Sequence, residues 1–192
     1  PAWADLLAVR KNWWSFQPIV NPSIPAGPAS SPIDRFLNAK IIAAKLTAAA
    51  KADKATLLRR VTYTLTGLPP TPAEIAAFQA DTSTEAYARV IDRLLASPRY
   101  GEHFARHWMD LVRYADTHGS EGDPNIPQSW RYRDYLIRAF NDNVPYDQFV
   151  REQIAGDLLT QPRVNPAEQL NESALGTGHF RLIEHGFQPV DT

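Results

Sequence analysis

Apolar side chains recur every three to four residues along most of the chain after Pro32, the spacing of one face of an α-helix. Phe36, Leu37 and Ile41 follow this spacing in one segment, and Val90, Ile91 and Leu94 follow it in another. No segment shows the sustained alternation of apolar and polar residues that marks a β-strand. We therefore predict an all-α fold, an irregular bundle of about seven helices with an extended, proline-rich N-terminal arm.

Capping residues mark several of the helix boundaries. Asp53 is a suitable N-cap for a helix that ends at Gly67. Thr71, followed by Pro72 and Glu74, has the pattern of a capping box at the start of the next helix. Further helices are expected near residues 98–119, 129–141 and 146–159, and Asn165-Pro166 is expected to start a last helix that runs to about Gly176.

The first 32 residues differ from the rest in composition. A short helix is expected from Asp5 to about Trp14, and residues 15–32 contain five prolines, which favour an extended tether over a helix. We therefore divide the chain into an N-terminal helix and tether, residues 1–32, and a helical domain, residues 33–192.

Composition excludes several classes of function. The chain has no cysteine, which excludes disulfides, thiolate metal sites and covalent attachment of haem c within it, so we expect no cofactor in this chain. A net charge of −1 gives no field that favours nucleic acid, and we expect no nucleic-acid partner. No run approaches the roughly 18 apolar residues of a membrane-spanning helix, and we expect no membrane insertion.

The candidate chemistry gathers in the segment Pro98–Gly119, which combines an apolar stripe centred on Trp108 with a polar edge rich in histidine. One interpretation is a metal site, because His103 and His107 are four residues apart and would lie on one helix face. Arg106 and Arg113 would repel a cation there, so we expect no metal and keep the two histidines only as candidate ligands.

A second interpretation is general acid–base catalysis, in which a carboxylate orients His107. The candidate polar cluster for such a site is formed by six residues of two predicted helices: His107, Asp110, Arg113, Asp116, Arg131 and Asp134.

A third interpretation is structural. Asp110 and Asp116 need cationic partners if they are partly buried, and Arg113, Arg131 and Arg133 are the nearest candidates. The histidine-rich edge would then pack against the segment Trp130–Arg138 through charged hydrogen bonds. We favour this network over the catalytic alternative.

Three long segments in order resemble a known family, domain of unknown function 1549: LLRRVTYTLTGLPPTPAEIAAF, LLASPRYGEHFARHWMDLVRYADTHG and WRYRDYLIRAFNDNVPYDQFVREQIAGDLL. The resemblance covers roughly residues 13 to 185. Residues 106–116 match the family's RHW-x-D-x-x-RYAD string, and residues 130–134 match its WRYRD string. His103 departs from the residue that is usual in the family, which argues against a two-histidine metal site.

The resemblance implies a setting more than an activity. Members occur in exported, planctomycete-type proteins beside cytochrome-c-like and carbohydrate-binding-like modules, and this chain is similar to the part that precedes a CxxCH haem-attachment segment. It implies a periplasmic or extracellular location, haem c only outside this chain, and partners among the other domains of the full-length protein, with carbohydrate as a further partner. We therefore expect a helical scaffold or docking module of an exported redox protein linked to polysaccharide breakdown. The alternative is a catalytic domain, a hydrolase or oxidoreductase acting on carbohydrate.

Overall fold

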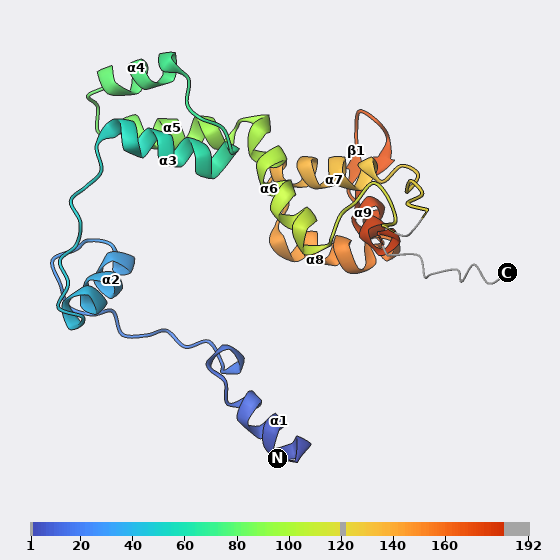
Figure 1. Cartoon of the computed structure of the whole chain (residues 1–192), viewed down its shortest axis with the longest axis horizontal. Helices are drawn as coiled ribbons and strands as arrows, with labels where there is room; N and C mark the ends of the chain where they lie inside the picture. Colours follow the sequence, from blue (N-terminus) through green and yellow to red (C-terminus); the bar gives the residue numbers. More distant parts are fainter. Residues whose placement is uncertain (1, 120–121, 183–192) are drawn as a thin grey trace. The chain divides into compact units, whose positions relative to one another are not determined.

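The structure, a computed structural model, describes residues 2–119 and 122–182 in two units, Pro1–Lys51 and Ala52–Thr192. The first unit contains α1 (Trp3–Lys11), the 3₁₀ helix η1 (Trp14–Phe16) and α2 (Pro32–Ala43), and an extended segment separates η1 from α2 (Figure 1). None of the side chains in these three helices is buried. A short helix is present at Trp3–Lys11, where one was predicted from Asp5 to about Trp14, and the division of the chain into residues 1–32 and 33–192 stays a prediction.

The second unit begins with three short helices that share a small core. α3 (Lys54–Thr66), α4 (Pro72–Ala80) and α5 (Ala86–Leu95) pack around Leu58, Phe78 and Ala86. The Asp53 side chain accepts a hydrogen bond from the Thr56 N–H at 2.8 Å, and Gly67 ends α3 with φ +69°. Thr71 and Glu74 form the reciprocal bonds of a capping box. These predicted boundaries are confirmed, because each depends on residues within one turn of the helix end.

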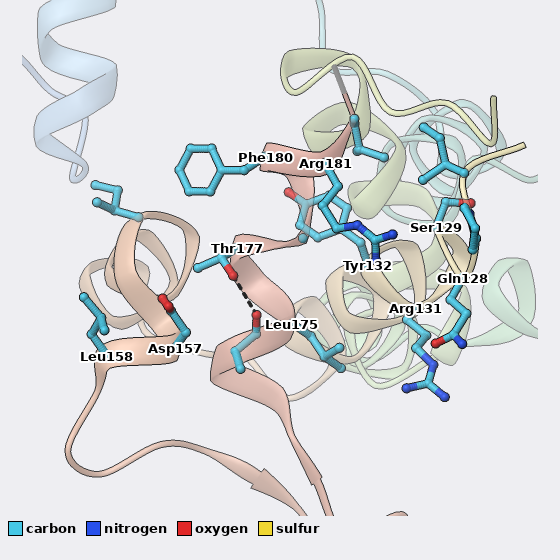
Figure 2. A pocket seen from close by; sticks show the side chains of 16 residues that line it. Gln128, Ser129, Arg131, Tyr132, Asp157, Leu158, Leu175, Thr177, Phe180 and Arg181 are labelled. Atoms are coloured by element: carbon cyan, nitrogen blue, oxygen red, sulfur yellow. Dashed lines mark hydrogen bonds between the residues drawn. The ribbon is translucent and has the colours of Figure 1, made fainter. Parts of the chain in front are cut away.

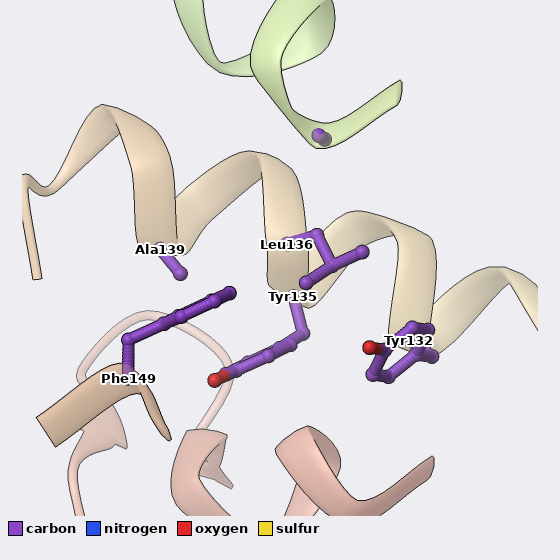
Figure 3. Packing of buried hydrophobic residues seen from close by; sticks show 6 residues of the cluster. Tyr132, Tyr135, Leu136, Ala139 and Phe149 are labelled. Atoms are coloured by element: carbon purple, nitrogen blue, oxygen red, sulfur yellow. The ribbon is translucent and has the colours of Figure 1, made fainter. Parts of the chain in front are cut away.

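The larger core lies among α6 (Pro98–Leu111), α7 (Trp130–Asn141) and α8 (Tyr146–Ala155). Figure 3 shows Tyr132, Tyr135, Leu136 and Ala139 along α7, with the ring of Phe149 from α8 beside them. The Tyr135 and Phe149 rings are stacked, with centroids 6.3 Å apart. α7 thus supplies four of the six buried residues of this core, and burial of apolar surface stabilises a fold by roughly 25 cal/mol per Å².

The predicted all-α class was wrong in one place. After η2 (Gly156–Leu158), the strands β1 (Val164–Asn165) and β2 (Leu170–Asn171) form an antiparallel pair, followed by α9 (Glu172–Leu175) and η3 (Gly176–Arg181). The described residues therefore form a mostly helical fold with nine α-helices and one small sheet, where about seven helices and no sheet were predicted.

Asn165 explains the missed hairpin. Its side-chain oxygen accepts hydrogen bonds from the N–H groups of Ala167 and Glu168, at 2.9 and 3.2 Å. An N-cap asparagine makes the same local bonds at a helix start, so the Asn-Pro pair is compatible with both structures. Here Asn165 closes a turn between two strands, and the predicted helix from Asn165 to Gly176 is replaced by the hairpin and α9.

The helix predicted over residues 98–119 also ends early, at Leu111. Arg113 has φ +54°, and the Tyr114 N–H donates to the Met109 carbonyl at 2.9 Å. These are features of a Schellman C-cap, in which glycine usually occupies the left-handed position. Arginine fills it here, so the sequence lacked the usual signal and the polar residues after Leu111 lie in a loop.

None of the helices within residues 2–119 and 122–182 has both the length and the apolar character needed to cross a membrane.

Gly101 tests the close packing of α6 on α7. A Cβ atom at this position would overlap the carbonyl oxygen of Ile137 and lie 2.5 Å from the Asn141 side-chain oxygen. Helix propensity alone favours alanine over glycine by about 1 kcal/mol. We expect Gly101→Ala instead to lower the free energy of unfolding by about 1–3 kcal/mol, measured by urea denaturation. Gly27→Ala, where the new methyl group meets open space, is the matched control, and equal effects of the two changes would contradict this packing.

Candidate functional site

The six residues of the predicted polar cluster lie on three different segments. His107 and Asp110 are exposed on α6, Asp116 lies in the loop that follows, and Arg131 and Asp134 are half-buried on α7. Arg113 occupies the left-handed turn after α6. Within the described part of the chain, no hydrogen bond or ion pair joins two of these six side chains.

Asp116 has hydroxyl partners in place of the arginine that we predicted. Its Oδ1 atom accepts hydrogen bonds from the Tyr114 hydroxyl at 2.7 Å and the Ser129 hydroxyl at 2.8 Å. The bond from Tyr114, then that from Ser129, lowers the pKa of Asp116, and the positive charge of Arg133 adds to the effect from a longer distance. We expected a cationic partner only if this carboxylate was partly buried; Asp116 is exposed, and its direct partners are the two hydroxyls.

Two arginines of α7 each contact a neighbouring residue of the same helix. Arg133 pairs with its neighbour Asp134, with a nitrogen–oxygen distance of 2.9 Å. The Arg131 guanidinium lies 5.5 Å from the ring centroid of Trp130. α6 contacts α7 through Gly101, Ala105 and Phe104 and not through its histidine-rich edge, so the predicted charged seam between the two helices is not formed.

The histidine pair of α6 lies at the end of α3. The rings of His103 and His107 meet edge to face, with centroids 5.0 Å apart, and the His103 ring rests on Gly67. Burial, and then the charges of His107 and Arg106, lower the pKa of His103, while a hydrogen bond to the Thr64 backbone acts in the opposite direction. The described residues contain no group of three or more His, Asp or Glu side chains suited to hold a metal ion. The metal-free state of the chain stays a prediction.

Sequence reasoning missed a group of buried polar contacts among the described residues. Glu152 of α8 is 0% exposed. Both of its carboxylate oxygens accept hydrogen bonds from the Arg163 guanidinium, at 3.1 and 3.2 Å. The hydroxyls of Tyr135 and Ser173 also donate to it, at 2.8 and 3.0 Å. Burial would raise the pKa of Glu152, but the bonds from Arg163, Tyr135 and Ser173 outweigh it, and the pKa lies below its usual value.

Two more buried groups extend this arrangement. Glu172 of α9, 1% exposed, accepts bonds from Arg138 of α7 at 2.6 and 3.3 Å and from Asn165 at 3.1 Å. The Gln153 side-chain oxygen accepts from the Trp108 indole N–H at 3.2 Å and the Tyr132 hydroxyl at 2.7 Å. These bonds connect α6, α7, α8 and α9. Their residues are far apart in sequence, so no local pattern signals them.

A pocket of about 670 Å³ lies between the start of α7, the end of α8 and η3. Figure 2 shows Arg131, Arg181 and Tyr132 on one side and Asp157 and Leu158 on the opposite side. Apolar side chains make up much of the remaining wall: Ile126, Ile154, Leu175 and Phe180. Arg131 is the only member of the predicted cluster among the residues that line this pocket.

Comparison with known proteins supports the resemblance seen in the sequence. Residues 32–188 match the model of a family, PSCyt2, described as "Protein of unknown function (DUF1549)". No match was found among curated proteins or among solved structures. The family resemblance is thereby confirmed, and its planctomycete-type setting and CxxCH segment stay predictions.

The position of His103 predicts a dependence of stability on pH. Folding lowers the pKa of His103, so below about pH 6.5 the unfolded chain binds more protons than the folded chain does. The free energy of unfolding therefore falls as the pH falls from about 6.5 through the lowered pKa. We expect His103→Gln to lose less stability than the wild type between about pH 7.5 and about pH 5.5, measured by urea denaturation.

His107→Gln is the matched comparison. It removes the charge beside His103 together with the His107 ring contacts, and the loss of that charge should reduce the acid sensitivity in part. Identical pH profiles for the wild type and His103→Gln would show that His103 is not held in its neutral form.

Proposed function

The chain belongs to the DUF1549 family, whose function is unknown, and we propose that it is a non-catalytic docking module of a larger protein. The observation that carries this proposal is the apolar surface of the first unit. Its partner is another domain of the same full-length protein.

The first unit presents large apolar side chains to solvent along its whole length. Trp14 and Phe16 of η1 are 78% and 73% exposed, and Ile33 and Ile42 of α2 are 71% and 73% exposed. The same holds for Trp3, Val9, Trp13, Ile19, Val20 and Leu46. Burying one such side chain contributes about 1.5–3 kcal/mol, and contiguous exposed apolar surface marks interaction sites in soluble proteins.

The polar chemistry of the second unit also supports a docking role over catalysis. Its buried carboxylates, Glu152 and Glu172, are fully engaged by Arg163 and Arg138. Carboxylates that accept several hydrogen bonds in this way have their charge compensated within the fold. The six residues of the catalytic alternative are not assembled into one site.

The family resemblance supplies the setting of the proposal. We place the module in an exported, periplasmic or extracellular redox protein whose haem c is attached outside this chain. We also propose a link to polysaccharide breakdown, with carbohydrate as a further partner of the protein. This part of the proposal rests on the same family resemblance.

Hydrogen–deuterium exchange tests the docking role directly. Residues 13–31 include many backbone amides with no hydrogen-bond partner within the described chain, so in the isolated chain they should exchange as fast as an unfolded peptide. In the full-length protein we expect the same amides to exchange at least about tenfold more slowly, because the apolar side chains are covered.

A triple change, Trp13→Ala with Trp14→Ala and Phe16→Ala, should abolish this protection. Asn21→Ala with Ser23→Ala, which alters exposed polar residues of the same segment, should preserve it. Equal exchange in the isolated chain and the full-length protein would contradict the proposal. Protection already present in the isolated chain would show that the arm is covered by its own chain and would also contradict it.

A further inference from the structure

The pocket between α7, α8 and η3 presents two arginines without acidic partners. Within residues 2–119 and 122–182, neither Arg131 nor Arg181 forms an ion pair or a side-chain hydrogen bond. Both side chains line the same side of the pocket (Figure 2). The other arginines that line buried regions, Arg138 and Arg163, are paired with carboxylates. Within the described residues, the pocket thus holds two arginines that have no carboxylate partner, and the Arg131 guanidinium lies over the Trp130 ring.

Arg131 is the clearer case. Its Nε atom is buried and has no hydrogen-bond partner. A buried donor without a partner is costly, and such an atom calls for an explanation, of which an ordered water, an ion or a bound ligand nearby is one. Arg131 is also in the first turn of α7, a helix of 12 residues whose N-terminus adds partial positive charge on the same side of the pocket.

The rest of the pocket defines the body of a ligand. Its volume of about 670 Å³ lies within the range of small-molecule sites. Leu158, Leu175 and Phe180 offer apolar contact, and Asp157 opposite the arginines disfavours a second negative charge at the far end. An inorganic ion would leave this apolar wall uncovered.

We propose that this pocket binds a small organic monocarboxylate, with the carboxylate against Arg131 and Arg181 and an apolar body between Leu175 and Phe180. The planar guanidinium groups match the two oxygens of a carboxylate. The inference does not depend on the docking role, which concerns a different unit of the chain.

Titration calorimetry of the whole chain with phenylacetate tests the site. Phenylacetamide has the same shape without the charge, and we expect it to bind at least about tenfold more weakly, since a charge-assisted bond is lost. Inorganic phosphate has the charge without the apolar body and should also bind at least about tenfold more weakly than phenylacetate.

Arg181→Gln is the principal variant, because Arg181 is exposed and its replacement leaves no internal bond broken. We expect it to weaken phenylacetate binding by about tenfold, and Arg131→Gln to do the same. Arg60→Gln removes the same charge from an exposed position on α3 outside the pocket lining and should bind phenylacetate as the wild type does. Circular dichroism of each variant confirms that it is folded.

Three results would overturn the proposal. They are equal binding of phenylacetate and phenylacetamide, unchanged phenylacetate affinity in both pocket variants, and phosphate binding as tight as that of phenylacetate. The absence of any saturable phenylacetate binding at millimolar concentration would do the same.

Discussion

The buried carboxylate of Glu152 is the group on which the C-terminal half of the molecule depends. A charge in the interior is tolerated only when other groups replace the water that it has lost. Arg163, Tyr135 and Ser173 supply the donors, and they come from three separate stretches of chain. Satisfying this one side chain therefore requires α7, α8 and the segment around the hairpin to be in place together.

That requirement explains the tight backbone packing nearby. A Cβ atom at Gly156 would overlap the Ser173 carbonyl oxygen, and one at Gly176 would lie 2.6 Å from the Glu152 carbonyl oxygen. The Arg163 carbonyl in turn accepts the Glu172 N–H at 2.9 Å, which holds the start of α9 beside the hairpin. η3 continues directly from α9, so the wall of the arginine-lined pocket is positioned by the same contacts.

The sequence predicted the features whose physical causes are local. Asp53 and the Thr71–Glu74 pair act within a single turn, and the structure has their helix ends where the capping pattern places them. Arg113 was misread because it occupies a left-handed conformation that glycine more often adopts. Asn165 was misread because the bonds that close its turn are the same local bonds that an N-cap asparagine makes at a helix start. The Glu152–Arg163 pair lay beyond prediction, since it depends on tertiary contact, and the pocket arginines carry no periodic signal at all.

A double-mutant cycle at Glu152 and Arg163 tests the central role of this pair most directly. Glu152→Gln and Arg163→Gln should each lower the free energy of unfolding by about 3–5 kcal/mol. The first change leaves the Arg163 guanidinium with the more distant Asp142 carboxylate, 3.7 Å away, and the second leaves the buried Glu152 carboxylate without its cation. The double variant should lose at least about 1 kcal/mol less than the sum of the two. Asp147→Asn, which breaks the exposed pair with Arg151 on the same helix, should cost less than about 1 kcal/mol. Losses at Glu152 and Arg163 no larger than that of Asp147→Asn, and additive with each other, would contradict the account.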